Sequence, residues 1–338
     1  MNKLIIAGNI YMLSKSLSEL CLLISTPYEN LNLCSDTVST LDYFILEEIY
    51  LKKLFYFKWR KKLKSSYSNF KFDYGYEILE QNSNFIKVKL NLSIYFTVET
   101  SKSKILSACI NEYIIILEHL HNTFKIQFLI ENEEDPLLYN YAQKADLSEI
   151  STFISTYHKS LWANNLSSID LLYDTFTTSS FFSNNNPNKR KASNFNITEA
   201  CAYAEKYALK ANPAYKSFDG IGGDCTNFMS QILSAGGVKE TNAWKPYTNP
   251  WIRVEEIYLY LTTQNLATKL PNKNSLSKGC LIQFYTPQIG KFFHNGFITY
   301  ELPNNDYLYC CHSYNKLNYP LSNIYPSKYP TLRALTIN

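Results

Sequence analysis

Two spacings of hydrophobic residues follow one another along this chain, and each predicts a different kind of element. Residues 1 to about 66 follow helical spacing, and Ser35-Asp36-Thr37 can begin a long helix that continues through Phe55. From Ile86 to Val98 the period becomes two, which predicts a strand with one buried face. Further elements are predicted as strands at 105–118 and 124–130 and as a helical stretch from Asp135-Pro136 towards Leu166.

A segment rich in Thr, Ser and Asn, residues 176–195, predicts a linker to a second region. Asn196 and Glu199 have the spacing of a capping box and begin a predicted helix. Later elements are predicted as a helix at 254–262 and strands at 279–286, 293–301, 306–313 and 331–337. The expected fold class is α+β. Residues 1–175 combine helices with a curved antiparallel sheet that resembles cystatin-like folds, and residues 196–338 pack helices on an antiparallel sheet.

The stretch from Gly220 to Gln231 carries the candidate chemistry. Its glycine-rich turn leads into Cys225, from which apolar side chains recur with helical spacing until Gly236-Gly237 closes the predicted helix. A thiol at a helix N-terminus lies beside unpaired N–H groups and the positive end of the helix dipole, which favour a thiolate. Asp224 is the expected N-cap, with its carboxylate bound to backbone N–H groups.

The glycines before Cys225 decide between two interpretations of this thiol. Most free cysteines are buried and inert. Here the nearly side-chain-free turn is expected to leave the sulfur uncovered and to let another backbone approach, so we interpret Cys225 as a nucleophile.

A cysteine nucleophile needs a base and a group that orients that base. His294 and His312 are the histidines of the second region, on strands joined by a short turn. If Tyr300 pairs with Asp306, the two histidines lie opposite each other on one face of the sheet. We therefore expect His294 to be the base and His312 to be its neighbour. The alternatives are a surface residue for His294 and a core histidine for His312.

Composition limits the classes of function. The chain has 338 residues with 46% hydrophobic and 18% charged residues, which is typical of a folded protein long enough for two domains. A net charge of +4 is too small over this length to suggest a nucleic-acid partner. No apolar run is long enough for a transmembrane helix, and Asn9 interrupts the apolar start, so we expect no secretory signal and no integral membrane segment.

The eight cysteines lack the spacing of a disulfide framework and are expected to be free thiols. A zinc site at Cys310, Cys311 and His312 is disfavoured because no second ligand pair follows and the two cysteines point to opposite faces of a strand. We expect no metal and no cofactor.

The run from Ile197 to Leu321 resembles the bacterial putative amidase domain family, distant relatives of the papain-like NlpC and CHAP cell-wall peptidases. It covers somewhat over a third of the chain. The matching pieces are the helix from Ala200 to Ala208, Asn212 to Tyr215, Gly222 to Gln231, Ala235 to Gly237, Trp244, Trp251, Gly279 with Ile282 to Phe284, His294 with Ile298-Thr299, and His312 with Leu317 to Leu321.

The resemblance implies a papain-like fold with Cys225 as nucleophile and His294 as base. It also implies that Tyr215 lies near the oxyanion hole. The third, orienting position falls on His312. This chain has His312-Ser313-Tyr314-Asn315 where family members carry a His-Thr-Asn-Asp-like run, so Asn315 stays an alternative.

The expected function is therefore a cysteine-dependent amidase or peptidase that acts on peptide or peptidoglycan-derived substrates. Two alternatives stay open. One is a thiol transferase or deamidase with the same nucleophile. The other is a binding protein with a vestigial papain-like domain. Trp244 and Trp251 either line the cleft or pack in the core. The expected location is the cytoplasm or non-classical export, whereas family analogy points to the cell envelope. The sequence leaves the oligomeric state open.

Overall fold

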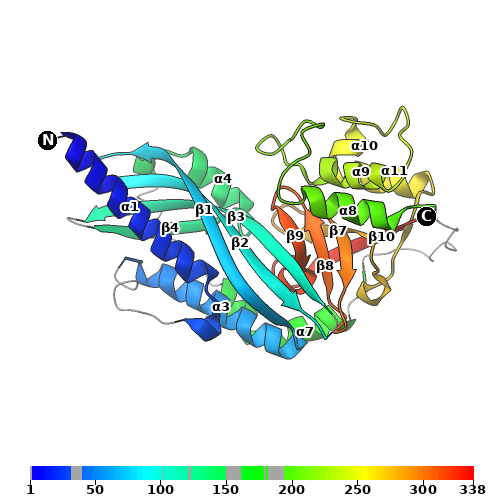
Figure 1. Cartoon of the computed structure of the whole chain (residues 1–338), viewed down its shortest axis with the longest axis horizontal. Helices are drawn as coiled ribbons and strands as arrows, with labels where there is room; N and C mark the ends of the chain where they lie inside the picture. The colour runs from blue at the N-terminus through cyan, green and yellow to red at the C-terminus, as the bar shows by residue number, and fades with distance from the viewer. Residues whose placement is uncertain are drawn as a thin grey trace. The chain divides into compact units, whose positions relative to one another are not determined.

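The computed structural model describes residues 2–31, 40–101, 103–120, 123–149, 161–178, 180–181 and 194–338, and these residues form both helices and strands (Figure 1). The chain divides into two units. The first consists of residues 1–97 and 110–169, and the second of residues 98–109 and 170–338. Helices together with a large antiparallel sheet confirm the α+β prediction.

The first unit combines helices with four strands in the order β1-β2-β3-β4. Its elements are α1 (Asn2–Ser25), a short 3-10 turn (Tyr28–Asn30), α3 (Tyr43–Leu63), β1 (Ser66–Gln81), β2 (Phe85–Glu99), β3 (Lys104–Leu120), β4 (Thr123–Glu131), α4 (Pro136–Lys144) and α6 (Leu161–Ser167). Both faces of the sheet carry buried side chains. Ile115 packs in a core with α1, whereas its neighbour Ile116 packs in a separate core with α4. This two-sided burial explains the nearly continuous apolar run in β3.

The first unit differs from the sequence predictions in two places. The strand β1 was not predicted, although Phe72, Tyr74 and Tyr76 alternate along it, because these rings are only half-buried against the core. The helix α3 begins at Tyr43 after the N-cap Asp42, not at residues 35–37, which lie outside the described part of the chain. By contrast, the start of α4 is confirmed: the Asp135 carboxylate accepts the N–H of Leu138, and Pro136 is the first helical residue.

The second unit places helices on a sheet in the order β9-β8-β7-β6-β10-β5. Ala108 and Cys109 of β3, which belong to this unit, pair with β9. The helices of the second unit are α7 (Ile169–Thr178, of which Ile169 belongs to the first unit), α8 (Ile197–Tyr207), α9 (Cys225–Ala235), α10 (Asn249–Ile252) and α11 (Val254–Thr263), with 3-10 turns at Lys273–Ser275 and Leu321–Asn323. Its strands are β5 (Ala267–Lys269), β6 (Leu281–Thr286), β7 (Lys291–Glu301), β8 (Tyr307–Cys311), β9 (Lys316–Pro320) and β10 (Thr331–Ile337).

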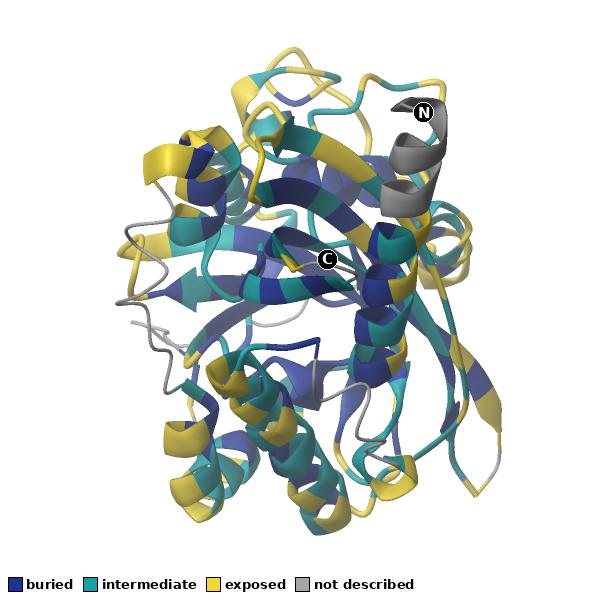
Figure 2. Cartoon of the chain, turned by 90° about the vertical axis from the view of Figure 1, so that its left-hand side faces the viewer, coloured by how far each residue is buried: buried dark blue, intermediate teal, exposed yellow. Residues whose placement is uncertain are grey.

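The helix α9 occupies the centre of the second unit. It contacts α8, α10, β7 and β8, and these neighbours cover it from several sides (Figure 1). Every residue from Cys225 to Leu233 is buried, including the polar residues Asn227, Ser230 and Gln231. Other helices keep an exposed face, as the alternating colours of Figure 2 show. The helix was predicted to be amphipathic, but the fold buries both of its faces.

Most element boundaries in the second unit follow the sequence patterns. The cap of α8 by Asn196, the end of α9 at Gly236-Gly237 and the helix α11 are confirmed, and Gly237 has the positive φ of 96° that closes such a helix. The short strands β5 and β9 were not predicted. The first residues of the predicted linker are helical, since α7 reaches Thr178. Residues 182–193 of that linker lie outside the described residues.

The predicted register between the two histidine-bearing strands was wrong. Phe297 pairs with Cys310 and Ile298 with Tyr309, one residue away from the expected alignment. The turn lies one residue later than expected, since Leu302 donates to the carbonyl of Asp306 and Glu301 pairs with Tyr307, and an irregularity between Ile298 and Tyr300 then shifts the pairing by one residue. Because a slip of one residue exchanges the faces of a strand, His294 and His312 do not share a face.

Candidate active site around Cys225

The loop before α9 depends on glycine. Gly220, Gly222 and Gly223 have φ values of 76°, 100° and 99°, a left-handed region that side chains disfavour. A Cβ on Gly223 would lie 3.0 Å from the hydroxyl oxygen of Ser313, whereas around Gly220 and Gly222 it would meet open space. The Ser313 hydroxyl accepts the N–H of Asp224 at 2.6 Å, which fixes the loop to the turn after β8.

The sulfur of Cys225 lies against the backbone of β7. Its thiol donates to the carbonyl oxygen of Phe293 at 3.9 Å, and the N–H of Asn295 donates to the sulfur. These two groups stand on either side of His294. The Thr226 hydroxyl lies 3.8 Å from the same sulfur. The fold therefore brings Cys225 to the segment that carries the predicted base.

The environment of the Cys225 thiol differs from the expected one. The residue is only 7% exposed, so the glycine loop does not uncover it. Burial raises the pKa of the thiol above its ordinary value, and the Asp224 charge acts in the same direction. Hydrogen bonds from Asn295 and Thr226 oppose this effect without reversing it. The N–H of Thr226 at the start of α9 acts to lower this pKa, as expected of a helix N-terminus, but removal from water outweighs it.

Asp224 does not cap α9 in the expected way. Its side chain makes no cap hydrogen bond to the helix. One carboxylate oxygen accepts the N–H of Phe218 at 2.9 Å and the side-chain amide of Asn227 at 2.8 Å. The other oxygen lies 2.7 Å from Nδ1 of His312. The carboxylate thus binds the preceding loop and a distant turn, and leaves the first N–H groups of α9 without a side-chain cap.

His312 is held on both ring nitrogens. Nε2 donates to the carbonyl oxygen of Tyr207 at 2.7 Å, since a carbonyl can only accept, and Nδ1 faces the Asp224 carboxylate. The ring stacks on Phe228 with centroids 3.8 Å apart. These contacts do not favour the expected role of His312 as the residue that orients His294, because no ring nitrogen is left for it. Its contacts instead join the end of α8 to the start of α9.

His294 is buried among aromatic rings. Its ring stacks on Phe284 with centroids 5.5 Å apart and contacts Phe293 and Tyr314. Tyr314 belongs to the turn that follows His312, two residues from the predicted third position. Sequence reasoning missed this neighbour because it assigned the turn residues by analogy.

The remaining predicted site residues lie at the edge of this core. Tyr215 is half-buried and its ring stacks on Trp251, whose indole N–H donates to Asn227 of α9. Asn315 is half-buried in the turn after β8. Trp251 and Trp244 are both fully buried, so of the two interpretations of these residues the core interpretation is correct.

Four buried polar residues beside Cys225 were missed by the sequence analysis. They are joined by hydrogen bonds and comprise Thr226, Asn295, Gln283 and Arg333. A signal was present: Asn295 lies two residues from the core residue Phe297, and Gln283 two residues from Leu281, at positions where an inward-facing strand residue is normally apolar.

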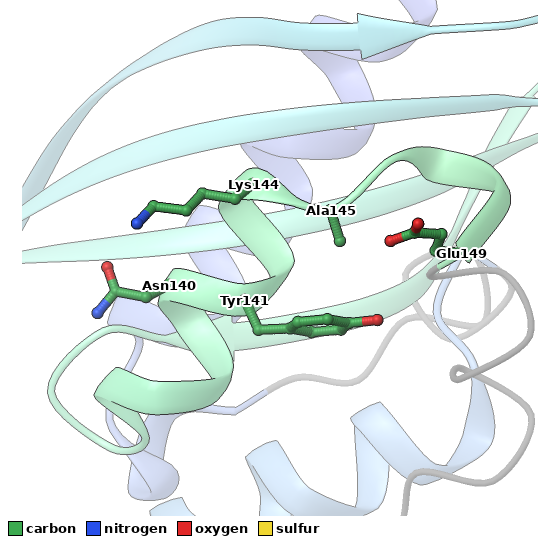
Figure 3. Close-up of a pocket in the computed structure, with 5 residues that line it drawn as sticks. All are labelled: Asn140, Tyr141, Lys144, Ala145 and Glu149. Carbon is green, nitrogen blue, oxygen red and sulfur yellow. The ribbon is translucent and has the colours of Figure 1, made fainter.

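Sites of other kinds are not found in the described residues. There, no group of three or more His, Cys, Asp or Glu side chains could hold a metal ion, and none of the helices has the length and apolar character of a membrane span. A pocket of about 380 Å³ lies in the first unit beside α4, lined by Asn140, Tyr141, Lys144, Ala145 and Glu149 (Figure 3). These residues are not part of the unit that contains Cys225.

Comparison with known proteins gives partial matches to two uncharacterized relatives. An uncharacterized protein of Bacillus subtilis (strain 168), YjcM, is 32% identical over 130 residues, which are 36% of this chain and 31% of the relative. A second uncharacterized protein of that organism, YhbB, is 31% identical over 108 residues, 28% of this chain and 34% of the relative. The chain thus spans about a third of each relative's length. No solved structure matches the chain.

A family model matches part of the second unit. Residues 194–333 match the family described as "Putative amidase domain", a stretch that contains α8, α9 and nearly all of the sheet from β5 to β10. The match suggests a hydrolase that acts on amide bonds, and the matched stretch contains the glycine loop, α9 and both histidines.

Proposed function

We propose that the second unit is a cysteine-dependent amidase that hydrolyses an amide bond with Cys225 as the nucleophile and His294 as the general base and acid. The observation that carries this proposal is the position of the Cys225 sulfur. It lies at the N-terminus of the central helix, inside the region matched by the amidase model, against the backbone on both sides of His294.

The start of α9 supplies the group that holds negative charge in the reaction. Attack of the sulfur on an amide carbonyl forms a C–S bond and places negative charge on the carbonyl oxygen. The backbone N–H of Cys225 is the proposed donor to this oxygen, and the lack of a side-chain cap on α9 supports it. Tyr215 is a further candidate donor, since its ring lies on Trp251 in the same core.

The raised pKa of Cys225 shapes the proposed proton transfer. A thiol that is protonated at neutral pH must lose its proton as it attacks, so His294 accepts the proton in that step. The imidazolium then returns the proton to the leaving amine as the C–N bond breaks, which leaves a thioester on Cys225. A water molecule, deprotonated by His294, cleaves the thioester to a carboxylic acid and restores the thiol.

The proposed substrates are peptides, with peptidoglycan-derived stem peptides as the class to test first. This choice rests on the resemblance to cell-wall peptidases and not on a binding surface. A panel of such peptides, read by mass spectrometry for new amine and carboxyl ends, also separates hydrolysis from deamidation, which releases ammonia, and from transfer, which needs a second amine.

The test compares Cys225→Ala with Cys201→Ala. Both changes remove a buried thiol of the same unit, but Cys201 lies in α8, away from the glycine loop. Cys225→Ala is expected to abolish amide cleavage with little change in melting temperature, whereas Cys201→Ala keeps activity. Cleavage by the Cys225→Ala protein at the wild-type rate would show that the nucleophile lies elsewhere.

The burial of Cys225 supports a second candidate, a binding protein whose amidase domain no longer reacts. A 7% exposed thiol with a raised pKa is what an inert core cysteine shows. The rate of alkylation against pH, read for each cysteine by mass spectrometry, separates the two. A Cys225 that reacts no faster than Cys201 at any pH favours the binding protein.

A further inference from the structure

A chain of hydrogen bonds crosses the apolar interior of the second unit and ends at Cys225. Nε of Arg333 donates to the carbonyl oxygen of the Gln283 amide at 2.5 Å. The amide nitrogen of Gln283 donates to the Asn295 oxygen at 2.7 Å. The Asn295 amide nitrogen donates to the Thr226 hydroxyl at 2.8 Å, and this hydroxyl lies 3.8 Å from the Cys225 sulfur.

The direction of every bond in this chain is fixed by its first member. A guanidinium has donors only, so the amide of Gln283 must present its oxygen to Arg333 and its nitrogen to Asn295. The same argument orients Asn295 and makes the Thr226 hydroxyl an acceptor. That hydroxyl therefore has its own proton to direct at the sulfur. All donors point from the cation towards Cys225.

Burial in the interior of the second unit strengthens the hydrogen bonds of this chain. Gln283, Asn295 and Thr226 are each no more than 1% exposed, and polarisation along hydrogen bonds is strongest where water is excluded. Buried polar groups among apolar neighbours are also costly to fold, so a complete chain of them calls for a reason beyond packing.

We propose that this one-way chain is a positioning and tuning device, in which the charge of Arg333 stabilises the ionised form of the Cys225 sulfur. The proposal rests on the proposed function, because it assigns the chain a role in activating the same nucleophile. The chain of hydrogen bonds stabilises the thiolate form of the buried Cys225 and so replaces part of the hydration that the sulfur has lost. The hydrogen bond from Thr226 acts to lower the pKa of Cys225, in the direction that the proposal requires.

Other charged and titratable groups face the two ends of the chain. At the sulfur end, Asp224 raises the thiol pKa, His294 lies on the neighbouring strand, and His312 is bound to Asp224. At the cation end, the Glu255 carboxylate lies 2.9 Å from Arg333, and the Tyr258 ring lies 3.7 Å from the guanidinium. The Glu255 side chain is 44% exposed, and its charge partly offsets that of Arg333.

The test titrates the Cys225 thiol in the full chain by its alkylation rate with iodoacetamide as a function of pH. Thr226→Val cuts the last link while keeping the shape, and it is expected to raise the pKa by about half to one unit, a three- to tenfold loss of thiolate near neutral pH. Thr226→Ser keeps the hydroxyl and is expected to titrate like the wild type. Arg333→Met removes the cation and should shift the pKa the same way as Thr226→Val.

Glu255→Gln supplies a change of opposite sign and does not disturb the buried chain. With the offsetting carboxylate gone, the Arg333 charge acts more strongly, so the Cys225 pKa is expected to fall by a few tenths of a unit. A purely structural role for these residues predicts no such opposite shifts. If Arg333→Met does not fold, Thr226→Val and Glu255→Gln carry the test.

The outcomes separate this inference from the proposed function, since the titration needs no substrate. Wild-type titration in Thr226→Val, together with Cys225-dependent amide cleavage by the wild type, overturns the chain and leaves the amidase. Opposite shifts in Thr226→Val and Glu255→Gln, with no amide cleaved, support the chain and overturn the amidase.

Discussion

The helices α4 and α9 both begin after an aspartate, yet the two aspartates act differently. In the first unit, the Asp135 carboxylate caps α4 by accepting the N–H of Leu138 at 3.0 Å. In the second unit, the Asp224 carboxylate makes no cap hydrogen bond to α9 and instead binds His312, the loop at Phe218 and the side-chain amide of Asn227. The difference shows that an aspartate before a helix predicts the start of the helix but does not predict which groups its carboxylate binds.

The diverted carboxylate has a consequence for the candidate site. Asp135 satisfies a helix end at the surface, which is an ordinary stabilising role. Asp224 leaves the N–H groups at Cys225 free of a side-chain cap, while it fastens the loop before the cysteine to the end of α8 through His312. The start of α9 is thus held in place by contacts beside the helix, without a side-chain cap on its first N–H groups.

The largest expected effect comes from removing the two aspartates in turn. Asp224→Ala removes the carboxylate that faces the buried ring of His312 and the acceptor of the Phe218 N–H. The free energy of unfolding should therefore fall by about 3–5 kcal/mol. Asp135→Ala should cost only about 1 kcal/mol. Urea unfolding of both variants measures the contrast, and equal costs would contradict it.

A smaller effect is expected at Ser313, which accepts the Asp224 N–H. Ser313→Ala leaves this N–H unsatisfied and should cost about 1–3 kcal/mol. Ser313 has a φ of 73°, so Ser313→Gly removes the same acceptor but relieves backbone strain of about 1 kcal/mol. The glycine variant should therefore be the more stable of the two in thermal unfolding. The reverse order would show that the positive φ of residue 313 carries no strain, and a Ser313→Ala protein as stable as the wild type would show that the hydroxyl is not what fixes the loop.

The smallest expected effect is a pH dependence at Cys225. Since its pKa is raised on folding, the unfolded chain loses the thiol proton first as pH increases above about 8.5, the ordinary value. The folded state then binds more protons, so wild-type stability falls relative to Cys225→Ala, by up to about 1.4 kcal/mol per pH unit. Parallel stability curves for the two proteins across this range would mean that the thiol is not desolvated.

Local features of the sequence predicted the elements around the site well. The spacing from Cys225 predicted α9, and Gly236-Gly237 predicted its end, because both signals act within one or two helical turns. The strand β7 and the helix α11 follow from the same kind of short-range pattern. The element that carries the candidate nucleophile could therefore be predicted from sequence, including the position of the cysteine at its first residue.

The contacts of the site could not be predicted in the same way, because they depend on residues far apart in the chain. His312 is 88 residues from Asp224, and no local pattern pairs them. A single irregularity in the pairing of β7 with β8 moved His312 to the opposite face from His294. The burial of Cys225 likewise depends on β7, which follows it by some 68 residues.

The short segment 104–109 of β3 has a bearing on how the region that matches the family model can be isolated. Ala108 and Cys109 pair with Leu317 and Lys316 of β9, far from the region that matches the family model. A fragment cut to residues 194–333 would leave the outer edge of β9 without its neighbour. Open strand edges recruit other chains, so such a fragment is expected to self-associate in solution unless the missing strand is supplied as a peptide.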